Sequence, residues 1–357
     1  MLSIHFVLPL VFASTLFALF VINAERDALS NRARRHVYAR QSSHTKPTPR
    51  IGGVAIAVGI LSGVLLSGND LFGLLLWTTL PIFLIGLMED IGPDSSRSVR
   101  LIVSALSAVL AVMIFGEHIH RVDVVFLDVL LSVKVIAILF TIFASVGMTH
   151  AVNLIDGLNG LSSFVVVSIM LAFGAIALQN GQSELLALNL IVCTSFLAFA
   201  FLNFPNGKIF LGDAGAYSIG HIIAWNAILL MVALPNASAW SILLIVLWPV
   251  LDTVFAIVRR SLRGQAIGEP DKLHFHQLLM RALTIRFPQT CTVDKANPIA
   301  SMLTWPFAAA PCIIGYFLID QPQRAMIATL VISSFYVLTY VILVKLARRS
   351  IPNTMTS

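Results

Sequence analysis

Long apolar runs alternate with short polar segments along almost the whole chain. A helix that crosses a membrane needs about 20 predominantly apolar residues, and runs of about this length recur throughout. The pattern predicts eleven membrane-spanning helices, at residues 3–23, 51–67, 71–88, 99–116, 133–149, 161–178, 185–203, 216–233, 239–258, 300–318 and 324–344. Little sequence remains between these runs. We therefore predict one all-α polytopic membrane domain over residues 1–357, with no separate soluble module.

The composition agrees with this pattern. Hydrophobic residues make up 58% of the chain and charged residues 11%, against about 25% charged residues in an ordinary soluble domain. The first run, residues 3–23, is apolar enough for a secretory signal, but basic residues follow it instead of preceding it. Signal peptides have the opposite order, so we interpret this run as the first transmembrane helix. The three cysteines have no spacing typical of a disulfide framework or a metal site.

The distribution of Lys and Arg predicts the topology. Alternate connections, beginning with residues 24–50 and ending with the C-terminal tail, hold 20 of the 23 basic residues. Because cytoplasmic loops carry the excess of Lys and Arg, we place these connections in the cytoplasm, with the N-terminus outside and the C-terminus inside. The net charge of +6 is then mainly a topology signal. It does not indicate nucleic-acid binding, since the chain has no basic domain interleaved with aromatic residues.

One polar stretch, N-L-I-D-G-L-N-G at residues 153–160, stands between two apolar runs on the predicted cytoplasmic side. Two glycines make it suitable for a tight turn at the membrane surface. A carboxylate and two amides make it equally suitable as the floor of an active site. Both interpretations stay open from this stretch alone.

Acidic residues at other span ends favour a site. Glu89, Asp90, Asp156 and Asp213 come from three separate span ends on the same predicted side. Converging carboxylates repel one another unless a cation lies among them, and hard oxygen ligands suit Mg²⁺, with Mn²⁺ as the alternative. The glycines of G-D-A-G, around Asp213, also let backbone N–H groups approach an anion closely.

Basic residues gather on that side as well. A metal with flanking cations is what a phosphoanhydride substrate requires, because both take up negative charge on phosphate oxygens. The two histidines of H-F-H would diverge on a helix and share a face in an extended loop. The basic candidates are Lys46, Arg50, Lys208, Arg259, Arg260, Arg263, Lys272, His274 and His276.

Five motifs in order resemble a known family. They are P-T-P-R-x-G-G, E-D at a span end, N-L-I-D-G-L-N-G, F-L-G-D-A-G and D-T…R-R…H-x-H, and they extend from about Ser42 to Arg281. Together they resemble the polyprenyl-phosphate N-acetylhexosamine-1-phosphate transferases, the WecA, MraY and WbpL group. The eleven predicted spans and the outward N-terminus are more similar to the WecA-like branch than to the ten-span MraY branch, and the P-T-P-R-x-G-G loop resembles WbpL.

The resemblance implies a reaction and its partners. The expected enzyme transfers an N-acetylhexosamine-1-phosphate from a UDP-sugar to undecaprenyl or another polyprenyl phosphate and releases UMP. It would work at the cytoplasmic face of a bacterial inner membrane, in the first membrane step of O-antigen, capsule or similar synthesis. Its partners would be the UDP-HexNAc, the polyprenyl phosphate and membrane lipids, without nucleic acid, and a homodimer stays open.

The same resemblance implies roles for individual residues. Asp213 and Asn153 would be the metal ligands. Asp90, Glu89 and Asp156 would form the catalytic group, with Asp90 as acid/base, nucleophile or positioning residue. Substrate-binding roles would fall to Asn159, Asn203, Lys208, Arg259, Arg260, His274, His276, Lys46 and Arg50.

Three positions depart from the family pattern. Glu89 replaces the first acid of an Asp-Asp pair, Asn159 stands where Asp is common, and Gln277 stands where His is common. None removes the predicted metal site, so we still expect an active enzyme. The sequence does not identify the sugar or the pathway.

Two other classes of protein share parts of this pattern. A transporter would also carry polar groups and broken helices, but near mid-membrane and with an internal repeat. Here His221 and Asn226 are the main polar candidates inside a span, and the two halves of the chain do not resemble each other. A non-catalytic membrane scaffold is the third hypothesis, and it would tolerate loss of Asp213.

Overall fold

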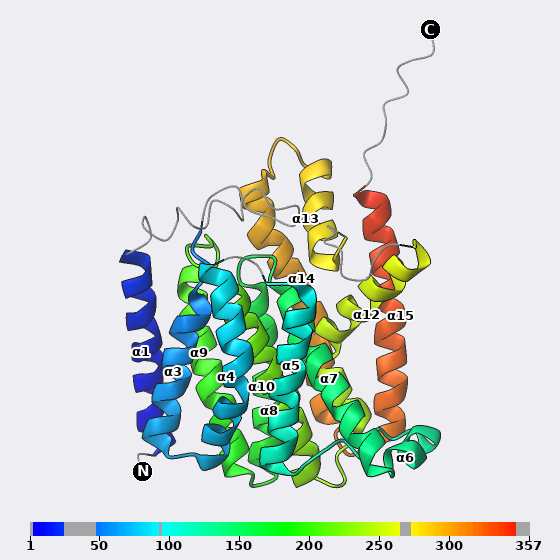
Figure 1. The fold of residues 1–357 in the computed structure, drawn as a ribbon. Helices are drawn as coiled ribbons and strands as arrows, with labels where there is room; N and C mark the ends of the chain where they lie inside the picture. The colour runs from blue at the N-terminus through cyan, green and yellow to red at the C-terminus, as the bar shows by residue number, and fades with distance from the viewer. Residues whose placement is uncertain (1–2, 25–47, 93–94, 265–272, 348–357) are drawn as a thin grey trace.

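The computed structural model describes residues 3–24, 48–92, 95–264 and 273–347, and this part of the chain folds into helices without strands. Most of the helices run side by side through one bundle (Figure 1). They are α1 (Ile4–Ala24), α3 (Gly52–Ser67), α4 (Asp70–Ile91), α5 (Arg97–Phe115), α6 (Val125–Leu131), α7 (Lys134–Ile155), α8 (Leu161–Gln179), α9 (Ser183–Asn203), α10 (Gly212–Ala233), α11 (Ala239–Ile245), α12 (Leu247–Leu262), α13 (Phe275–Arg286), α14 (Val293–Phe317) and α15 (Pro322–Leu346).

The prediction of an all-α polytopic membrane protein is confirmed. Nine helices of the described ranges are long and apolar enough to cross a membrane, and the bent pair α11 and α12 would make a tenth span. Each predicted apolar run coincides with one of these segments or with α3, which is shorter at 16 residues. The count of eleven spans and the orientation stay predictions.

The predicted continuous helix at 239–258 is wrong, because the chain bends by 83° between α11 and α12. Pro249 lacks the N–H that would pair with the Ile245 carbonyl in an unbroken helix. The thiol of Cys312, on α14, donates to that carbonyl instead, at 3.2 Å. The break is therefore stabilised from a neighbouring helix, as interrupted membrane helices require.

Two predicted connections contain helices that the apolar pattern did not indicate. The segment 117–132 contains α6, and the segment 259–299 contains α13. The helix predicted to start at residue 300 already starts at Val293. Neither α6 nor α13 is a long apolar run, so a search for spans passes over both.

Helix α10 forms the centre of the bundle, where it packs against α3, α4, α7 and α8. Small residues make this packing close: a Cβ on Gly220 would lie 2.6 Å from the Cα of Thr149 on α7, and one on Gly86 of α4 would lie 2.6 Å from the Cα of Ala214. Such small residues commonly let membrane helices approach. As a result, the ends of α4 and α7 lie beside the start of α10 at one end of the bundle (Figure 1).

Two polar residues inside the membrane region have partners on neighbouring helices. His221 on α10 lies 3.0 Å from the Thr78 hydroxyl on α4 and 3.5 Å from the Ser145 hydroxyl on α7. Asn226 donates to Asn189 on α9 at 2.8 Å. The two mid-span residues that a transporter hypothesis would need are thus engaged in helix–helix hydrogen bonds.

Candidate functional site

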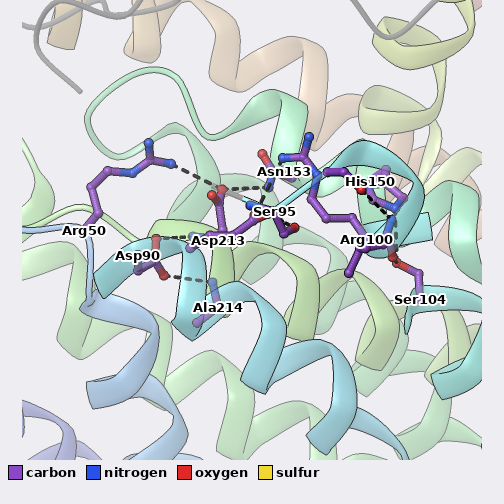
Figure 2. A network of polar contacts seen from close by, with 12 residues as sticks. Arg50, Asp90, Ser95, Arg100, Ser104, His150, Asn153, Asp213 and Ala214 are labelled. Atoms are coloured by element: carbon purple, nitrogen blue, oxygen red, sulfur yellow. Dashed lines mark hydrogen bonds and ion pairs between the residues drawn. The ribbon is translucent and has the colours of Figure 1, made fainter. Parts of the chain in front are cut away.

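The N-terminus of α10 organises the candidate site. The backbone N–H groups of Asp213 and Ala214 donate to the two carboxylate oxygens of Asp90, at 2.8 and 2.9 Å (Figure 2). These N–H groups have no partner within the helix and carry partial positive charge. Asp90 therefore caps α10 from the end of α4. The backbone N–H groups of G-D-A-G thus approach an anion, which is the Asp90 carboxylate of the same protein.

Gly212 makes this approach possible. Its φ is +78°, in the left-handed region that favours glycine. A Cβ at this position would also collide with the carbonyl of Arg50 and lie 2.6 Å from the Asp90 carboxylate. The turn before α10 thus requires glycine for both conformation and space.

Asp213 joins three segments that are far apart in the sequence. Its Oδ1 accepts from the Arg50 guanidinium at 3.3 Å and from the Asn153 side-chain amide at 2.9 Å (Figure 2). Burial alone would lower the pKa of Arg50, but Asp213, Asp90 and Asp156 raise it above its ordinary value. Arg50 therefore stays positively charged beside three carboxylates, and the side chain of Asp213 keeps 18% of its surface exposed.

The four acidic candidates do not form one metal-binding cluster. Within the described ranges, no three His, Cys, Asp or Glu side chains are placed to hold one metal ion. What remains is the partly exposed Asp213 carboxylate with the Asn153 amide beside it. Rotation of that amide would present its oxygen instead of its nitrogen. Such a pair fits Mg²⁺, which often takes only one or two protein ligands and leaves positions for water and substrate phosphates.

Glu89 has partners of its own. Its carboxylate is 2% exposed, lies 3.6 Å from the Arg100 guanidinium, and accepts from the Ser95 backbone N–H at 3.2 Å and from the Ser95 hydroxyl. Glu89 thereby ties the end of α4 to the start of α5. The sequence motifs gave Arg100 no role at the site, although its position as the fourth residue of α5, beside an acidic span end, could have indicated this pair.

The stretch 153–160 is both a turn and a wall of the site. Asn203 accepts from the Gly160 N–H at 2.6 Å and donates to the Ile209 carbonyl at 2.9 Å. Asn159 donates to the Pro205 carbonyl at 2.7 Å. These two buried amides hold the turn against the loop before α10. Their predicted nucleotide contacts stay predictions.

Asp156 follows directly after α7 in this turn. Burial raises its pKa to about 6, against the opposing effects of Ser162 and Arg50. At neutral pH the carboxylate remains mostly ionised. It adds a third negative charge to those of Asp90 and Asp213 around Arg50.

A second polar cluster lies around α12, α13 and α15. Asp252 on α12 accepts from His274 Nδ1 at 2.7 Å, from the Phe275 N–H at 3.1 Å and from the Tyr336 hydroxyl at 2.7 Å. Arg259 donates to the Leu273 carbonyl and to the Tyr340 hydroxyl. Sequence reasoning did not assign Asp252 a role; a carboxylate within an apolar run is the signal that could have done so.

The H-x-H pair connects the two clusters. The rings of His274 and His276 lie nearly parallel with centroids 5.9 Å apart, so the two histidines share a face. His276 is fully buried, and its Nε2 would lie 2.5 Å from a Cβ on Gly157 in the turn. Burial lowers the pKa of His276 to about 4, so the imidazole is neutral at pH 7.

Three predicted residues remain to be placed. Lys208 is exposed on the loop before α10, and Arg260 is buried near the end of α12. Lys46 lies outside the described residues. The structure thus brings together Arg50, Asp90, Asn153, Asp156 and Asp213 at one centre, with His276 reaching the adjoining turn.

Fold and site together define a polytopic membrane protein with a paired cation and carboxylate at a helix N-terminus. Comparison with known proteins gives the family. Residues 72–231 match the model of glycosyl transferase family 4. The chain is 35% identical over 241 residues to a probable undecaprenyl-phosphate N-acetylglucosaminyl 1-phosphate transferase of Bacillus subtilis, covering 66% of this chain and 67% of the relative. The chain belongs to this family, as its motifs predicted.

Two further relatives show the breadth of the family. The chain is 26% identical to an undecaprenyl-phosphate alpha-N-acetylglucosaminyl 1-phosphate transferase of Yersinia pestis, covering 67% of each chain. It is 27% identical to a phospho-N-acetylmuramoyl-pentapeptide-transferase of Streptococcus thermophilus, covering 63% of this chain and 70% of the relative. The chain matches about two thirds of the length of these relatives.

Proposed function

We propose that this protein transfers an N-acetylhexosamine-1-phosphate from a UDP-sugar to a polyprenyl phosphate and releases UMP. The observation that carries the proposal is the meeting of Arg50, Asn153 and Asp213 at the N-terminus of α10. A fixed cation, with a carboxylate and an amide that can hold a metal ion, can together bind several phosphate oxygens. Relatives named for GlcNAc-1-phosphate transfer support the same reaction.

The proposed reaction is a phosphoryl transfer. An oxygen of the lipid phosphate attacks the sugar-bearing phosphorus of the UDP-sugar. The bond from that phosphorus to the bridging oxygen breaks, and UMP leaves with the electron pair. A phosphate monoester has a second pKa near 6, so at pH 7 the lipid phosphate is largely a dianion and leaves a general base little proton to remove.

Protein residues then act mainly by positioning and charge. Asp213 and Asn153 would hold Mg²⁺, which would neutralise charge on the diphosphate oxygens. Arg50 would hold a phosphate oxygen beside them. Since both oxygens of Asp90 accept backbone N–H groups, we assign Asp90 to shaping the α10 N-terminus, and this favours direct attack over a covalent aspartyl-phosphate.

We place the reaction at the cytoplasmic face of a bacterial inner membrane, in the first membrane step of a cell-surface polysaccharide. The basic-residue distribution supports the face, since the site lies where α4 and α7 end and α10 starts, at span ends that the sequence places on the Lys- and Arg-rich side. The relatives differ in their named sugars, so the choice of sugar and pathway is part of the test.

The test is a UDP-sugar panel with purified protein in nanodiscs, undecaprenyl phosphate and Mg²⁺. We expect acceptor-dependent UMP release and a lipid diphosphate-sugar of the matching mass. UMP release without any lipid acceptor would contradict direct attack. Absence of turnover with every UDP-HexNAc, together with flux of a solute into vesicles, would favour the transporter hypothesis.

A further inference from the structure

Helix α6 exposes apolar side chains over much of its surface. Val125, Phe126 and Val129 are 84%, 72% and 65% exposed. Within α6, Leu131 is the one residue that is buried. The single charged side chain of the helix, Asp128, accepts from a backbone N–H of the preceding loop at 2.7 Å. An exposed apolar surface of this kind marks a contact with a protein or with a membrane.

The helix lies at the end of the bundle opposite the candidate site. It directly precedes α7, whose last turn carries Asn153, and the 22 residues of α7 extend over about 33 Å. That length matches a hydrocarbon core of about 30 Å. Figure 1 shows α6 projecting sideways from the bundle at this far end, away from α13. The position of α6 is therefore the boundary between membrane and water on the side away from the site.

Hydrogen bonds fix the segment before α6 to the start of α11. Asp123 has a φ of +57°, in the left-handed region, and its carboxylate accepts from the Arg121 guanidinium at 2.9 Å and from the Ala239 N–H at 2.7 Å. Arg121 also donates to the Ala237 carbonyl at 2.7 Å. We call these three contacts the Asp123 latch. The latch connects the entrance of α6 to a helix more than 100 residues further along the chain.

We propose that α6 is a membrane anchor that lies along the lipid interface on the side opposite the candidate site. The lipid-facing surface of α7 continues into it, since Val135 and Leu139 of α7 are 66% and 62% exposed. Lys134 is exposed between the two apolar patches, where a long side chain can keep its ammonium among the lipid headgroups. Aromatic and aliphatic side chains of interfacial helices enter the membrane boundary by about 5–10 Å.

A second copy of the chain matches this surface less well than lipid does. Helix α6 is about 10 Å long and about 10 Å wide, whereas a stable interface buries roughly 800 Å² on each partner. Val125, Phe126 and Leu127 are consecutive and all exposed. Because consecutive residues of a helix are about 100° apart, the apolar surface covers more than half of the circumference. Fluid lipid can surround such a helix, while a rigid partner contacts one face.

The anchor has a consequence for the broken helix pair. Helix α11 has 7 residues, so it is about 10 Å long, and it ends at the 83° bend before α12. Since the Asp123 latch holds the start of α11 beside α6, the bend lies about 10 Å from the lipid interface. Helix α12, which begins at that depth, carries the Asp252 carboxylate that accepts from His274.

The first experiment measures the depth of α6 in nanodiscs with single spin labels. The labels are attached to Phe126→Cys, to His120→Cys on the exposed loop before α6, and to Leu139→Cys on the lipid-facing side of α7. Collision with oxygen reports lipid, and collision with the water-soluble complex NiEDDA reports solvent. Wild type treated with the label is the blank, because its three native cysteines are buried.

We expect the label at position 126 to collide with oxygen more, and with NiEDDA less, than the label at position 120, and to lie shallower than the label at position 139. Collision with NiEDDA at position 126 equal to that at position 120 would overturn the proposal, since α6 would then face water. Shielding from both reagents, with spin–spin broadening that disappears in nanodiscs holding one copy, would also overturn it and identify a second copy as the partner.

The second experiment tests the Asp123 latch through the mobility of the label at position 126. Asp123→Ala removes the carboxylate, and we expect the spectrum of this label to sharpen as α6 becomes mobile. Asp123→Asn keeps a side-chain oxygen and tolerates the left-handed conformation, so the spectrum should change less. An unchanged label at position 139 in both variants verifies that the bundle is intact. An unchanged label at position 126 in Asp123→Ala would overturn the role of the latch.

Discussion

Two polar clusters contain residues from the family motifs, but their carboxylates are held differently. Asp213 keeps 18% of its side chain exposed and accepts hydrogen bonds from two side chains, Arg50 and Asn153. Asp252 is 2% exposed and accepts from a histidine, a backbone N–H and a tyrosine. The first arrangement leaves room for a ligand, whereas the second fixes His274. An acidic residue in a motif can thus act on a substrate or position another residue, and exposure separates the two.

The largest effect is expected at Asp213. Asp213→Asn keeps the size of the side chain and removes its charge, so the metal pair would lose its only carboxylate. We expect kcat to fall by about three orders of magnitude or more, since catalysis here depends on electrostatic stabilisation. The rate of UMP release measures this fall in kcat. The thermal unfolding midpoint in detergent should remain close to wild type, and wild-type turnover would favour the scaffold hypothesis.

Asp252→Asn should act on stability as well as on activity. Asp252 accepts three buried hydrogen bonds, and leaving a buried polar partner unsatisfied costs about 1–3 kcal/mol; His274 would also lose its orientation. We expect a lower unfolding midpoint and a loss of turnover smaller than in Asp213→Asn. Tyr336→Phe is the matched control, because it removes a single hydrogen bond worth about 1 kcal/mol. Equal losses of activity in Asp252→Asn and Asp213→Asn, with unchanged stability, would place Asp252 in the chemistry.

The pair Glu89 and Arg100 gives an intermediate case. Arg100→Met would leave a buried carboxylate without its ion-pair partner, at a cost of about 1–3 kcal/mol. Combining it with Glu89→Gln should recover much of that stability, and a double-mutant cycle of unfolding midpoints measures the coupling. If Glu89→Gln alone abolishes turnover while stability is retained, Glu89 is catalytic and not a positioning residue.

Substitution of His276 is expected to have a small effect on stability that depends on pH. Burial lowers its pKa to about 4, from an ordinary value of 6.5. Below pH 6.5 the unfolded chain binds a proton that the folded protein excludes, so the stability contribution is full above pH 6.5 and declines as the pH falls toward 4. His276→Asn should therefore show a flatter stability profile between pH 6.5 and 4 than wild type. Parallel profiles would contradict a neutral buried imidazole.

Most of the fold could be predicted from the hydrophobic pattern, because a membrane-spanning helix must be long and apolar. The break before α12 could not be predicted in this way, because it depends on Pro249 and on the hydrogen bond that the Cys312 thiol of α14 donates to the Ile245 carbonyl. Short helices such as α13 are likewise invisible to a search for spans. Local length and composition predict individual spans, but contacts between distant helices determine where a span bends.

The site was predictable in its membership and less so in its roles. The motifs identified Arg50, Asn153 and Asp213, and the structure brings these three together. The motifs did not show that both carboxylate oxygens of Asp90 would accept N–H groups at the N-terminus of α10, or that Glu89 would pair with Arg100. Residue type indicates which chemistry is possible, whereas the partner of each oxygen depends on the packing of α4, α5 and α10.

Acceptor-dependent UMP release tests the central claim most directly. Purified wild type and Asp213→Asn are compared with one active UDP-HexNAc, with and without undecaprenyl phosphate, and the lipid product is weighed by mass spectrometry. Our account predicts UMP and lipid diphosphate-sugar in equal amounts from the wild type, only when the acceptor is present, and almost none from Asp213→Asn. Equal turnover by the two proteins would contradict the assignment of the reaction to the α10 N-terminus.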